Sequence, residues 1–533
     1  MTLHPVLVAG RWRAADASSE FRARDPRTGD AVGDTYPTSR WSDVDEALDA
    51  AAAAARALRA ASPDVVADFL EGYADRIEAR AGEICALAGQ ETALPTETRL
   101  AGIELPRTTG QLRKAAAAAR AGDWAQATID TAAGIRSVLE PIGPVVVFGP
   151  NNFPLAFGSA SGGDFAAAVA AGNPVIAKAH PLHPGTTRLL AEEAHSAAES
   201  AGLPPGAVQL LYDVDHAEGE RLVADPRVGA VAFTGSRSGG LALKRAADAA
   251  GTPIYLELGA VNPTFVLPGA LAERGAAIAG ELAGSCLLGT GQFCTNPGLV
   301  LTVAGDRAEA LVEGVADAFR SAPAGTLFSG SGRDGLARAV AALRTAGAES
   351  VVGGGPEDGT HAVHQNTLLR VDGAAFLERH AALQEEAFGN AMLVVVAADE
   401  DELVRSASLL EASLTGCIVS AHDGGDDALY GRVQAELRPR VGRLLDDKMP
   451  TGVAVSPAMH HGGPFPAAGH PGFTAVGVPG ALRRFAGLAC YDNVRPHRLP
   501  PLLADANPRG AWRSVDGEYT KDPIASDTLE TNR

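Results

Sequence analysis

Short apolar runs alternate with alanine-rich amphipathic stretches through much of the first half of the chain. The apolar runs suited to buried strands are residues 144–148, 175–179, 208–212, 229–233 and 254–258. Helical stretches separate them at 163–171, 185–201, 216–224 and 239–249. Strands and helices that alternate in this way are typical of a parallel sheet covered on both faces. The pattern therefore predicts a doubly wound α/β domain.

Further helices are expected before this series. One covers residues 44–61, and the next begins at Ser62-Pro63, where serine is a good N-cap and proline a good first helical residue. Another helix is expected at 106–121, and a strand at 135–139.

A second α/β series follows from about Val266 to Gly477. Its strand candidates are residues 300–303, 393–396 and 417–419, with alanine-rich helices between them. The tail from Pro496 is rich in proline, arginine, asparagine and aspartate, which predicts an extended arm rather than a domain.

Charge and length narrow the class of function. The chain has 533 residues, a formal net charge of −19 and a pI near 5.1. This length allows two or three domains with ample core. Binding to phosphate backbones needs a basic face, so the acidic balance argues against a nucleic-acid partner.

The cysteines and the apolar runs indicate the cellular compartment in which the protein is expected. The cysteines are scattered, without CxxC or Cys/His ligand spacing, at Cys85, Cys286, Cys294, Cys417 and Cys490. This spacing predicts neither a disulfide framework nor a metal site, and it favours a reducing compartment. No basic and apolar leader is evident, and no apolar run approaches the roughly 20 residues that span a bilayer. We expect a cytoplasmic protein with no membrane partner.

A thiol and a carboxylate are the candidate chemistry. Cys294 lies in the turn GQFCTN from Gly291, and Glu257 closes the strand candidate at 254–258. A thiol in a polar turn is poorly placed for core packing. A nucleophile and a separate base are the minimum set for covalent catalysis through a thioester. A structural cysteine and an unrelated strand-end glutamate remain the alternative that these two residues leave open.

Six short segments in order resemble motifs of the aldehyde dehydrogenase superfamily. They are GPNNFP (149–154), IAK (176–178), FTGS (233–236), ELG (257–259), GQFC (291–294) and EEAFG (385–389). The variants ELGAVNP and GQFCTNPG are most similar to the NADP-dependent branch, which contains 2,5-dioxovalerate (α-ketoglutarate semialdehyde) dehydrogenases and certain fatty aldehyde dehydrogenases. The resemblance implies an oxidoreductase with a Rossmann-type cofactor domain, an α/β catalytic domain and an oligomerisation element.

The resemblance also implies a division of the chain. The NADP-binding domain is expected at 1–125 and 143–257, and the catalytic domain at 258–485. The third part, an oligomerisation element, consists of a hairpin at 126–142 and a C-terminal arm at 486–533. We expect a homodimer or a homotetramer.

The resemblance supplies catalytic roles that physical reasoning supports. Cys294 attacks the aldehyde as a thiolate, and the Asn152 amide with the Cys294 backbone N–H stabilises the oxyanion. Hydride transfer to the nicotinamide leaves a thioester, which water activated by Glu257 hydrolyses. On composition alone, Asn152 is a turn residue between two prolines.

For the cofactor, Lys178 is expected at the adenosine ribose. NAD-preferring relatives often carry a glutamate three residues later, where this chain has Pro181. Without that carboxylate, Lys178 and His180 remain to attract a 2′-phosphate, which favours NADP over NAD. Further candidate cations are His216, Arg237 and Lys244.

Other cofactor contacts follow from the same resemblance. Gly235 and Ser236 open a helix whose N-terminus would hold the pyrophosphate, and an ordinary capped turn is the alternative. Glu386 and Phe388 match the motif that holds the nicotinamide ribose and ring, although Asn390 replaces the usual proline. For Glu386 the alternative is a solvated loop carboxylate.

Two further segments could suggest function. Residues 330–335 (GSGRDG) fit G-x-G-x-x-G but follow turn composition rather than a strand, so we interpret them as a loop. His460 and His461 could suggest a metal pair, but neighbouring residues point apart and no ligand follows at suitable spacing. We interpret them as lining of a substrate tunnel.

The substrate implied by resemblance is 2,5-dioxovalerate, oxidised to 2-oxoglutarate. Medium- or long-chain aldehydes are the alternative, and a CoA-acylating dehydrogenase is disfavoured by the presence of Glu257. A non-enzymatic binding protein would be expected to lose one of the three catalytic residues. Candidates for binding a substrate carboxylate are Ser159, Ser161 and the residues around Phe465, and no arginine is evident there.

Overall fold

In the computed structural model, which describes residues 3–357 and 361–525, the five apolar runs of the first half lie side by side as parallel strands. They are β7 (Val145–Phe148), β8 (Val175–Lys178), β9 (Val208–Leu211), β11 (Ala230–Thr234) and β12 (Ile254–Glu257). Antiparallel β1 (Val6–Val8) and β2 (Arg11–Arg13) extend the sheet to the order β12-β11-β7-β8-β9-β1-β2.

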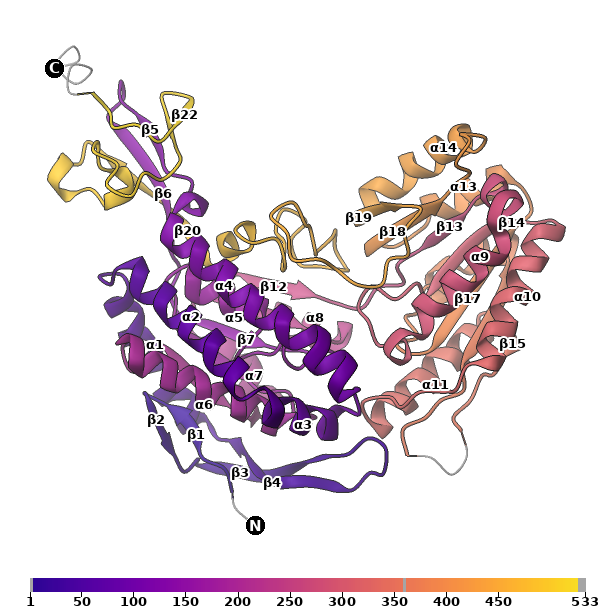
Figure 1. Ribbon diagram of the computed structural model, residues 1–533, viewed down its shortest axis with the longest axis horizontal. Helices are drawn as coiled ribbons and strands as arrows, with labels where there is room; N and C mark the ends of the chain where they lie inside the picture. Colours follow the sequence, from indigo (N-terminus) through magenta and orange to yellow (C-terminus); the bar gives the residue numbers. More distant parts are fainter. Residues whose placement is uncertain (1–2, 358–360, 526–533) are drawn as a thin grey trace.

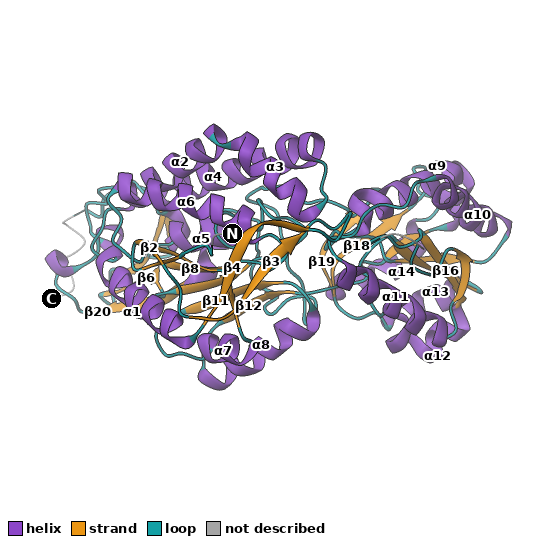
Figure 2. Cartoon of the chain, turned by 90° about the horizontal axis from the view of Figure 1, so that it is seen from below, coloured by secondary structure: helices purple, strands orange, loops and turns teal. Residues whose placement is uncertain are grey.

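Helices cover both faces of this first sheet, so the doubly wound prediction is confirmed (Figure 2). The crossover helices are α5 (Gly163–Ala170), α6 (Pro184–Ala201), α7 (His216–Val223) and α8 (Arg237–Ala250). Additional helices are α1 (Trp41–Leu58), α2 (Pro63–Ala79), α3 (Ala81–Thr92), the π-helix η1 (Thr96–Glu104) and α4 (Leu105–Ala121). The Ser62 hydroxyl accepts from the Asp64 backbone N–H at 3.2 Å, which confirms the expected N-cap.

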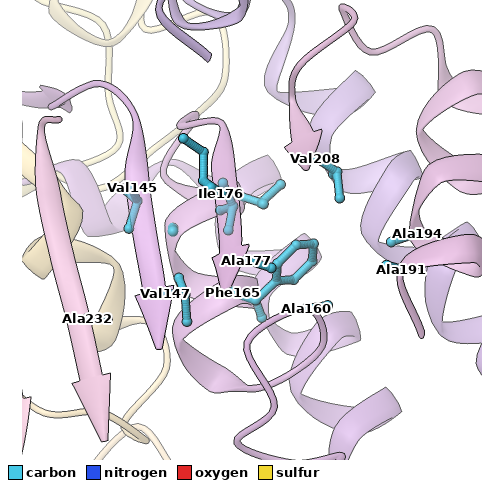
Figure 3. Close-up of a cluster of buried hydrophobic side chains, with 14 of the residues drawn as sticks. Val145, Val147, Ala160, Phe165, Ile176, Ala177, Ala191, Ala194, Val208 and Ala232 are labelled. Atoms are coloured by element: carbon cyan, nitrogen blue, oxygen red, sulfur yellow. The ribbon is translucent and has the colours of Figure 1, made fainter. Parts of the chain in front are cut away.

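The core of the first lobe explains why its strands are almost wholly apolar. Val145, Val147, Ile176 and Ala177 are fully buried, and Phe165 of α5 packs among them (Figure 3). Parallel strands covered on both faces have no solvent side on which polar residues would be favoured. Polar side chains of this lobe therefore gather where the strands end.

The second series forms a separate sheet in a second lobe (Figure 1), in the order β15-β16-β17-β14-β13-β18-β19. Its strands are β13 (Thr264–Val266), β14 (Leu299–Val303), β15 (Glu349–Val352), β16 (Thr367–Asp372), β17 (Ala391–Ala397), β18 (Ser413–Val419) and β19 (Val441–Asp446). Its helices are α9 (Pro268–Leu287), η3 (Leu288–Gly291), α10 (Asp306–Ser321), α11 (Gly330–Thr345), α12 (Gly373–Leu383), α13 (Glu400–Ser408), α14 (Asp427–Leu437) and η4 (Arg438–Arg440).

A third sheet projects from the first lobe, in the order β20-β6-β5-β21-β22 (Figure 1). It contains β5 (Thr128–Asp130), β6 (Ile135–Pro141), β20 (Ala486–Asp492), β21 (Arg513–Val515) and β22 (Glu518–Thr520), with η2 (Asp123–Ala125), η6 (Pro496–Arg498) and η7 (Pro501–Leu503) beside them. The tail from Pro496 thus adds strands to this sheet. Residues 1–2 and 526–533 of the expected divisions lie outside the described residues.

A small sheet, β10-β4-β3, lies at the edge of the first lobe. It consists of β3 (Ala17–Arg24), β4 (Ala31–Ser39) and β10 (Asp213–Val214). None of the helices in the described part of the chain combines the length and apolarity that a bilayer crossing requires.

The segment between β19 and β20 returns the chain from the second lobe to the first. Ala468 forms a bridge with Glu257, and the Leu258 backbone N–H donates to the Ala467 carbonyl at 2.9 Å. Further on, η5 (Gly480–Phe485) contributes Leu482 and Phe485 to the core of the first sheet. The return segment is therefore packed against the end of β12.

The loop interpretation of residues 330–335 is wrong. These residues form the first turns of α11, and the Ser329 hydroxyl caps it by accepting from the Gly332 backbone N–H at 3.0 Å. Before them, Thr326 makes only an isolated bridge to Val363, so no strand leads into the glycines among the described residues. The glycines therefore lie within a helix that no strand precedes, which does not match the dinucleotide-binding pattern.

Candidate active site

Cys294 lies in the turn between α9 and β14. Gly289, Thr290 and Gly291 all have positive φ there, with values of 58°, 58° and 69°. A Cβ on Gly291 would overlap the Gly389 carbonyl, so this position requires glycine. The turn brings the thiol from the second lobe to the end of the first sheet.

Glu257 is the last residue of β12, and its side chain is buried. The ligand-type atoms of Glu257, Cys294 and His461 all lie within 4.8 Å of one another. His461 Nε2 is 2.8 Å from Glu257 Oε1 and 3.6 Å from Cys294 Sγ. The structure therefore joins the predicted nucleophile and the predicted base through a histidine.

The interpretation of His461 as tunnel lining stays a prediction, and the structure adds that its ring takes part in this cluster and lines a cavity with Glu257. His461 reaches the site on the return segment, held by a 3.0 Å hydrogen bond from its backbone N–H to Thr474 Oγ1. Its partners come from two other parts of the chain, so no local spacing could have revealed them. His460 does not belong to the cluster.

Burial and charge set the proton positions at the site. Burial raises the pKa of the Cys294 thiol well above its usual range, and the neighbouring Glu257 carboxylate raises it further. Burial also opposes ionisation of Glu257, but the charge and hydrogen bond of His461 outweigh it and lower the Glu257 pKa. The resting pair is thus a thiol beside a carboxylate, which can accept the thiol proton as the sulfur attacks.

Asn152 is held beside the nucleophile turn. Its buried amide donates to the Gln292 carbonyl at 3.0 Å, which leaves a second N–H for another acceptor. Asn262, which the sequence named only as part of a motif, donates to the Cys294 carbonyl at 2.9 Å. Both amides fix the backbone that carries the thiol.

The strand end expected at the adenosine ribose carries an ion pair. Lys178 Nζ lies 2.7 Å from Oδ1 of Asp213, on the neighbouring strand β10. His180 is stacked on His183 with ring centroids 5.4 Å apart, and burial lowers its pKa well below the usual range. His180 is therefore neutral near pH 7 and cannot supply the positive charge that the sequence analysis allowed it.

Gly235 and Ser236 lie where β11 meets α8. The Ser236 hydroxyl caps α8 by accepting from the Gly239 backbone N–H at 3.3 Å, as in an ordinary capped turn. The Gly235 backbone N–H donates to the Glu257 carbonyl at 3.1 Å. Of the further candidate cations, Arg237 pairs with Glu411 and Lys244 with Asp248.

Glu386 lies against the backbone that follows Glu257, and burial raises its pKa to about 7. Its Oε1 accepts from the Ala260 backbone N–H at 3.1 Å, and a Cβ on Gly259 would overlap Oε2. Glu386 and Phe388 line one cavity together with Ala260. Glu386 is thus a half-buried loop carboxylate that is hydrogen-bonded to the backbone, and its contact with the nicotinamide ribose stays a prediction.

Asn390 stands where the related motif has a proline, and its side chain makes buried hydrogen bonds. Its amide donates to the His364 carbonyl and to Asn366 Oδ1, both at 2.8 Å.

The Ser161 hydroxyl, a candidate for binding a substrate carboxylate, donates to the Leu155 carbonyl at 2.7 Å and so holds the local backbone. Phe465 is 55% exposed.

Comparisons with known proteins agree on one family. The model of the aldehyde dehydrogenase family matches residues 12–435. Alpha-ketoglutaric semialdehyde dehydrogenase 2 of Azospirillum brasilense is 39% identical, covering 97% of this chain and 100% of its own. The alpha-ketoglutaric semialdehyde dehydrogenase of Acinetobacter baylyi is 35% identical, covering 92% and 94%.

Solved structures agree in fold. Aldehyde dehydrogenase C of Pseudomonas syringae, a mutant in complex with NAD+ and octanal, superposes with a TM-score of 0.78 at 20% identity, covering 93% of this chain and 98% of that one. Aldehyde dehydrogenase 21 of Physcomitrella patens, in complex with succinate, gives a TM-score of 0.76 at 22% identity, with coverage of 92% and 98%.

Proposed function

This chain belongs to the aldehyde dehydrogenase family, and from that premise we propose that it oxidises 2,5-dioxovalerate to 2-oxoglutarate with NADP. Oxidation of an aldehyde to a carboxylic acid with a nicotinamide nucleotide is the activity of the family. The choice of substrate is supported by two relatives with this named activity, which align over nearly the whole chain.

The observation that carries the proposed chemistry is the cluster of Cys294, Glu257 and His461. Cys294 Sγ attacks the aldehyde carbon while its proton passes to Glu257, giving a thiohemiacetal. The second N–H of Asn152 and the Cys294 backbone N–H stabilise the oxyanion. Bound NADP supplies a hydride acceptor. Loss of hydride from the thiohemiacetal to the bound nucleotide would leave a thioester on Cys294. Glu257 must then pass the thiol proton to solvent, after which it can take a proton from the water that attacks the thioester and return it to the leaving Cys294 sulfur.

His461 is a positioning residue in this scheme. With Nε2 protonated it donates to Glu257 Oε1, which fixes the carboxylate beside the sulfur. The same interaction keeps Glu257 ionised despite its burial, so that the base is ready for both proton transfers. The bound thioester carbon then lies within reach of a water held by Glu257.

The residues present fit a dinucleotide. The N-terminus of α8 and the side-chain-free Gly235 would hold the pyrophosphate, and Glu386 with Phe388 would hold the nicotinamide ribose and ring. Gly259 has no Cβ, which is what allows Glu386 to lie there.

The preference for NADP rests on charge at the end of β8. Lys178 and Asp213 form a pair that is neutral overall, and Pro181 adds no carboxylate beside it. A 2′-phosphate therefore meets no net negative charge, and the Lys178 amine can turn toward it.

We also propose the expected division into an NADP-binding domain (1–125 and 143–257), a catalytic domain (258–485) and an oligomerisation element. The third sheet would mediate a homodimer or homotetramer, because it exposes large apolar side chains at Leu488, Trp512 and Tyr519. The free cysteines suit the reducing cytoplasm.

Initial-rate kinetics test the proposed substrate. Purified protein is assayed with 2,5-dioxovalerate, succinate semialdehyde and hexanal, each with NADP and with NAD. The highest kcat/KM is expected for 2,5-dioxovalerate with NADP. A higher value for hexanal would replace the proposed substrate with an aliphatic aldehyde, and product that forms only when CoA is added would replace hydrolysis with acyl transfer.

A further inference from the structure

Arg107 of α4 is a half-buried cation beside the active site. Its guanidinium lies 5.3 Å from the centre of the Phe157 ring and donates through Nη1 to the Val453 carbonyl. Its Nε and Nη2 atoms are buried and have no hydrogen-bond partner among the described residues. Burial lowers its pKa, and the strongest opposing charge that it experiences is that of Cys294.

Arg443 of β19 approaches the same place from the second lobe. Its Nη2 donates to the Pro450 carbonyl at 2.8 Å, and Nη1 donates to the Gly452 carbonyl at 3.1 Å. Its Nε is buried without a partner in the part of the chain that the structure describes. Burial lowers its pKa too, and Cys294 again supplies the strongest opposing charge.

Both guanidinium groups hold backbone carbonyls of residues 450–453, and neither forms an ion pair with a carboxylate of the described residues. Arg99, nearby on the π-helix, has Glu104 at 3.6 Å. The chain is rich in carboxylates, yet these two half-buried guanidinium groups, each with buried nitrogens that lack a partner, have only neutral acceptors. A buried cation without a counter-charge is costly, and a planar guanidinium is suited to bind a carboxylate through two hydrogen bonds.

Apolar side chains connect Arg107 with the active site, because Phe157 contacts both the Arg107 guanidinium and the His461 ring. Phe153, Phe157, Phe293 and Val476 form one buried cluster, and Val453 and Met459 pack against it. Phe157 also contacts the His461 ring, with centroids 5.9 Å apart. An aldehyde at Cys294 would thus lie along apolar side chains and end near the two cations.

We propose that Arg107 and Arg443 bind the carboxylate of the substrate, so that the enzyme selects short aldehydes with a carboxylate at the far end. The donors available to this carboxylate are Nε and Nη2 of Arg107 and Nε of Arg443, which have no hydrogen-bond partner among the described residues. This inference rests on the proposed function and assigns its specificity to two residues from different lobes.

Matched substrates test the assignment. Arg107→Met and Arg443→Met are assayed with 2,5-dioxovalerate and with pentanal, which has the same chain length and no charge. Each variant should lose about tenfold to a hundredfold in kcat/KM for 2,5-dioxovalerate while pentanal changes by less than about threefold. Arg107→Lys should recover part of the loss, because it keeps the charge without the planar fork. Equal losses with both substrates would overturn the assignment.

Lys114→Met is the control for an effect through the loop. Lys114 Nζ donates to the Val455 carbonyl at 2.7 Å, so it holds the same segment but is exposed. It should leave the ratio of the two substrates unchanged. A change in that ratio as large as in the arginine variants would show that loop anchoring, not carboxylate binding, sets the preference.

A competition experiment needs no variant. Glutarate and pentanoate have the same chain length, but only glutarate carries a second carboxylate. Glutarate should compete with the aldehyde at least about tenfold more tightly in the wild-type enzyme. Equal inhibition would overturn the carboxylate site. A wild type that prefers pentanal to 2,5-dioxovalerate would instead contradict the proposed substrate, and the glutarate comparison would still test the arginines separately.

Discussion

His461 and Glu257, 204 residues apart in the chain, share a hydrogen bond of 2.8 Å between Nε2 and Oε1. The same Nε2 atom lies 3.6 Å from the Cys294 sulfur. One imidazole edge thus faces both the base and the nucleophile. His461 should therefore influence both the attack of Cys294 on the aldehyde and the hydrolysis of the thioester.

Replacement of His461 tests this influence. In the wild type, His461 lowers the Glu257 pKa against the effect of burial, which raises it. In His461→Phe this lowering influence is lost while the weaker effects of Cys294 and Arg484 remain, so the Glu257 pKa rises and the acidic limb of the kcat profile should move to higher pH. We expect kcat to fall by about tenfold to a hundredfold. His461→Gln, which keeps an N–H donor, should recover part of the activity. An unchanged pH profile in both variants would contradict the positioning role.

Glu257 and Cys294 can be separated by pre-steady-state kinetics. In the proposed scheme Glu257 takes both the thiol proton and the water proton, so Glu257→Gln should slow the burst of NADPH as well as the turnover that follows it. Cys294→Ala should give no burst, because no thiohemiacetal can form. Stopped-flow absorbance at the NADPH band measures both, and a burst in the Cys294 variant would rule out the covalent mechanism.

Cofactor preference is expected to depend on the end of β8. Pro181→Glu places a carboxylate there, and kcat/KM for NADP should fall at least about tenfold while NAD holds level or gains. Lys178→Ala should affect NADP more than NAD.

Asp213→Asn is the complementary change at that strand end. It removes the negative partner of Lys178, so NADP should gain relative to NAD. If these three variants change both cofactors equally, the preference is not set at this strand end.

Gly259→Ala tests the proposed role of Glu386 at the nicotinamide ribose. The added Cβ would overlap Oε2 of Glu386 and displace its carboxylate. The KM for the cofactor should rise and kcat fall, each by several-fold, with little change in thermal stability. Gly280→Ala in α9, where a Cβ meets nothing within 4 Å, is the matched control and should keep wild-type kinetics. Wild-type cofactor kinetics in Gly259→Ala would argue against a role for Glu386.

The strands of the first sheet were predictable because nearly every residue in them is buried. Val145 to Phe148 and Val175 to Lys178 follow directly from unbroken apolar runs. The Lys178–Asp213 pair was within reach, since neighbouring parallel strands end at the same edge and β9 leads directly into β10.

Other features of the site depend on packing between distant segments. His461 contacts Glu257 only because the return segment pairs with the end of β12 at Ala468. Arg107 and Arg443 come from different lobes, and each looks like an ordinary surface cation in its own helix or strand pattern. The hydrophobic pattern of the sequence does not distinguish them, because residues 450–453, which contact both arginines, belong to neither the helix nor the strand that carries them.

The return segment has a consequence for how the molecule is made. A growing chain completes Glu257 and then Cys294 well before residue 461 has been synthesised. The thiol therefore stands without its histidine until the last part of the second lobe has crossed back and paired beside Glu257. A chain that stops before residue 461 would therefore keep the nucleophile and the base but lack the hydrogen bond that holds the base in place.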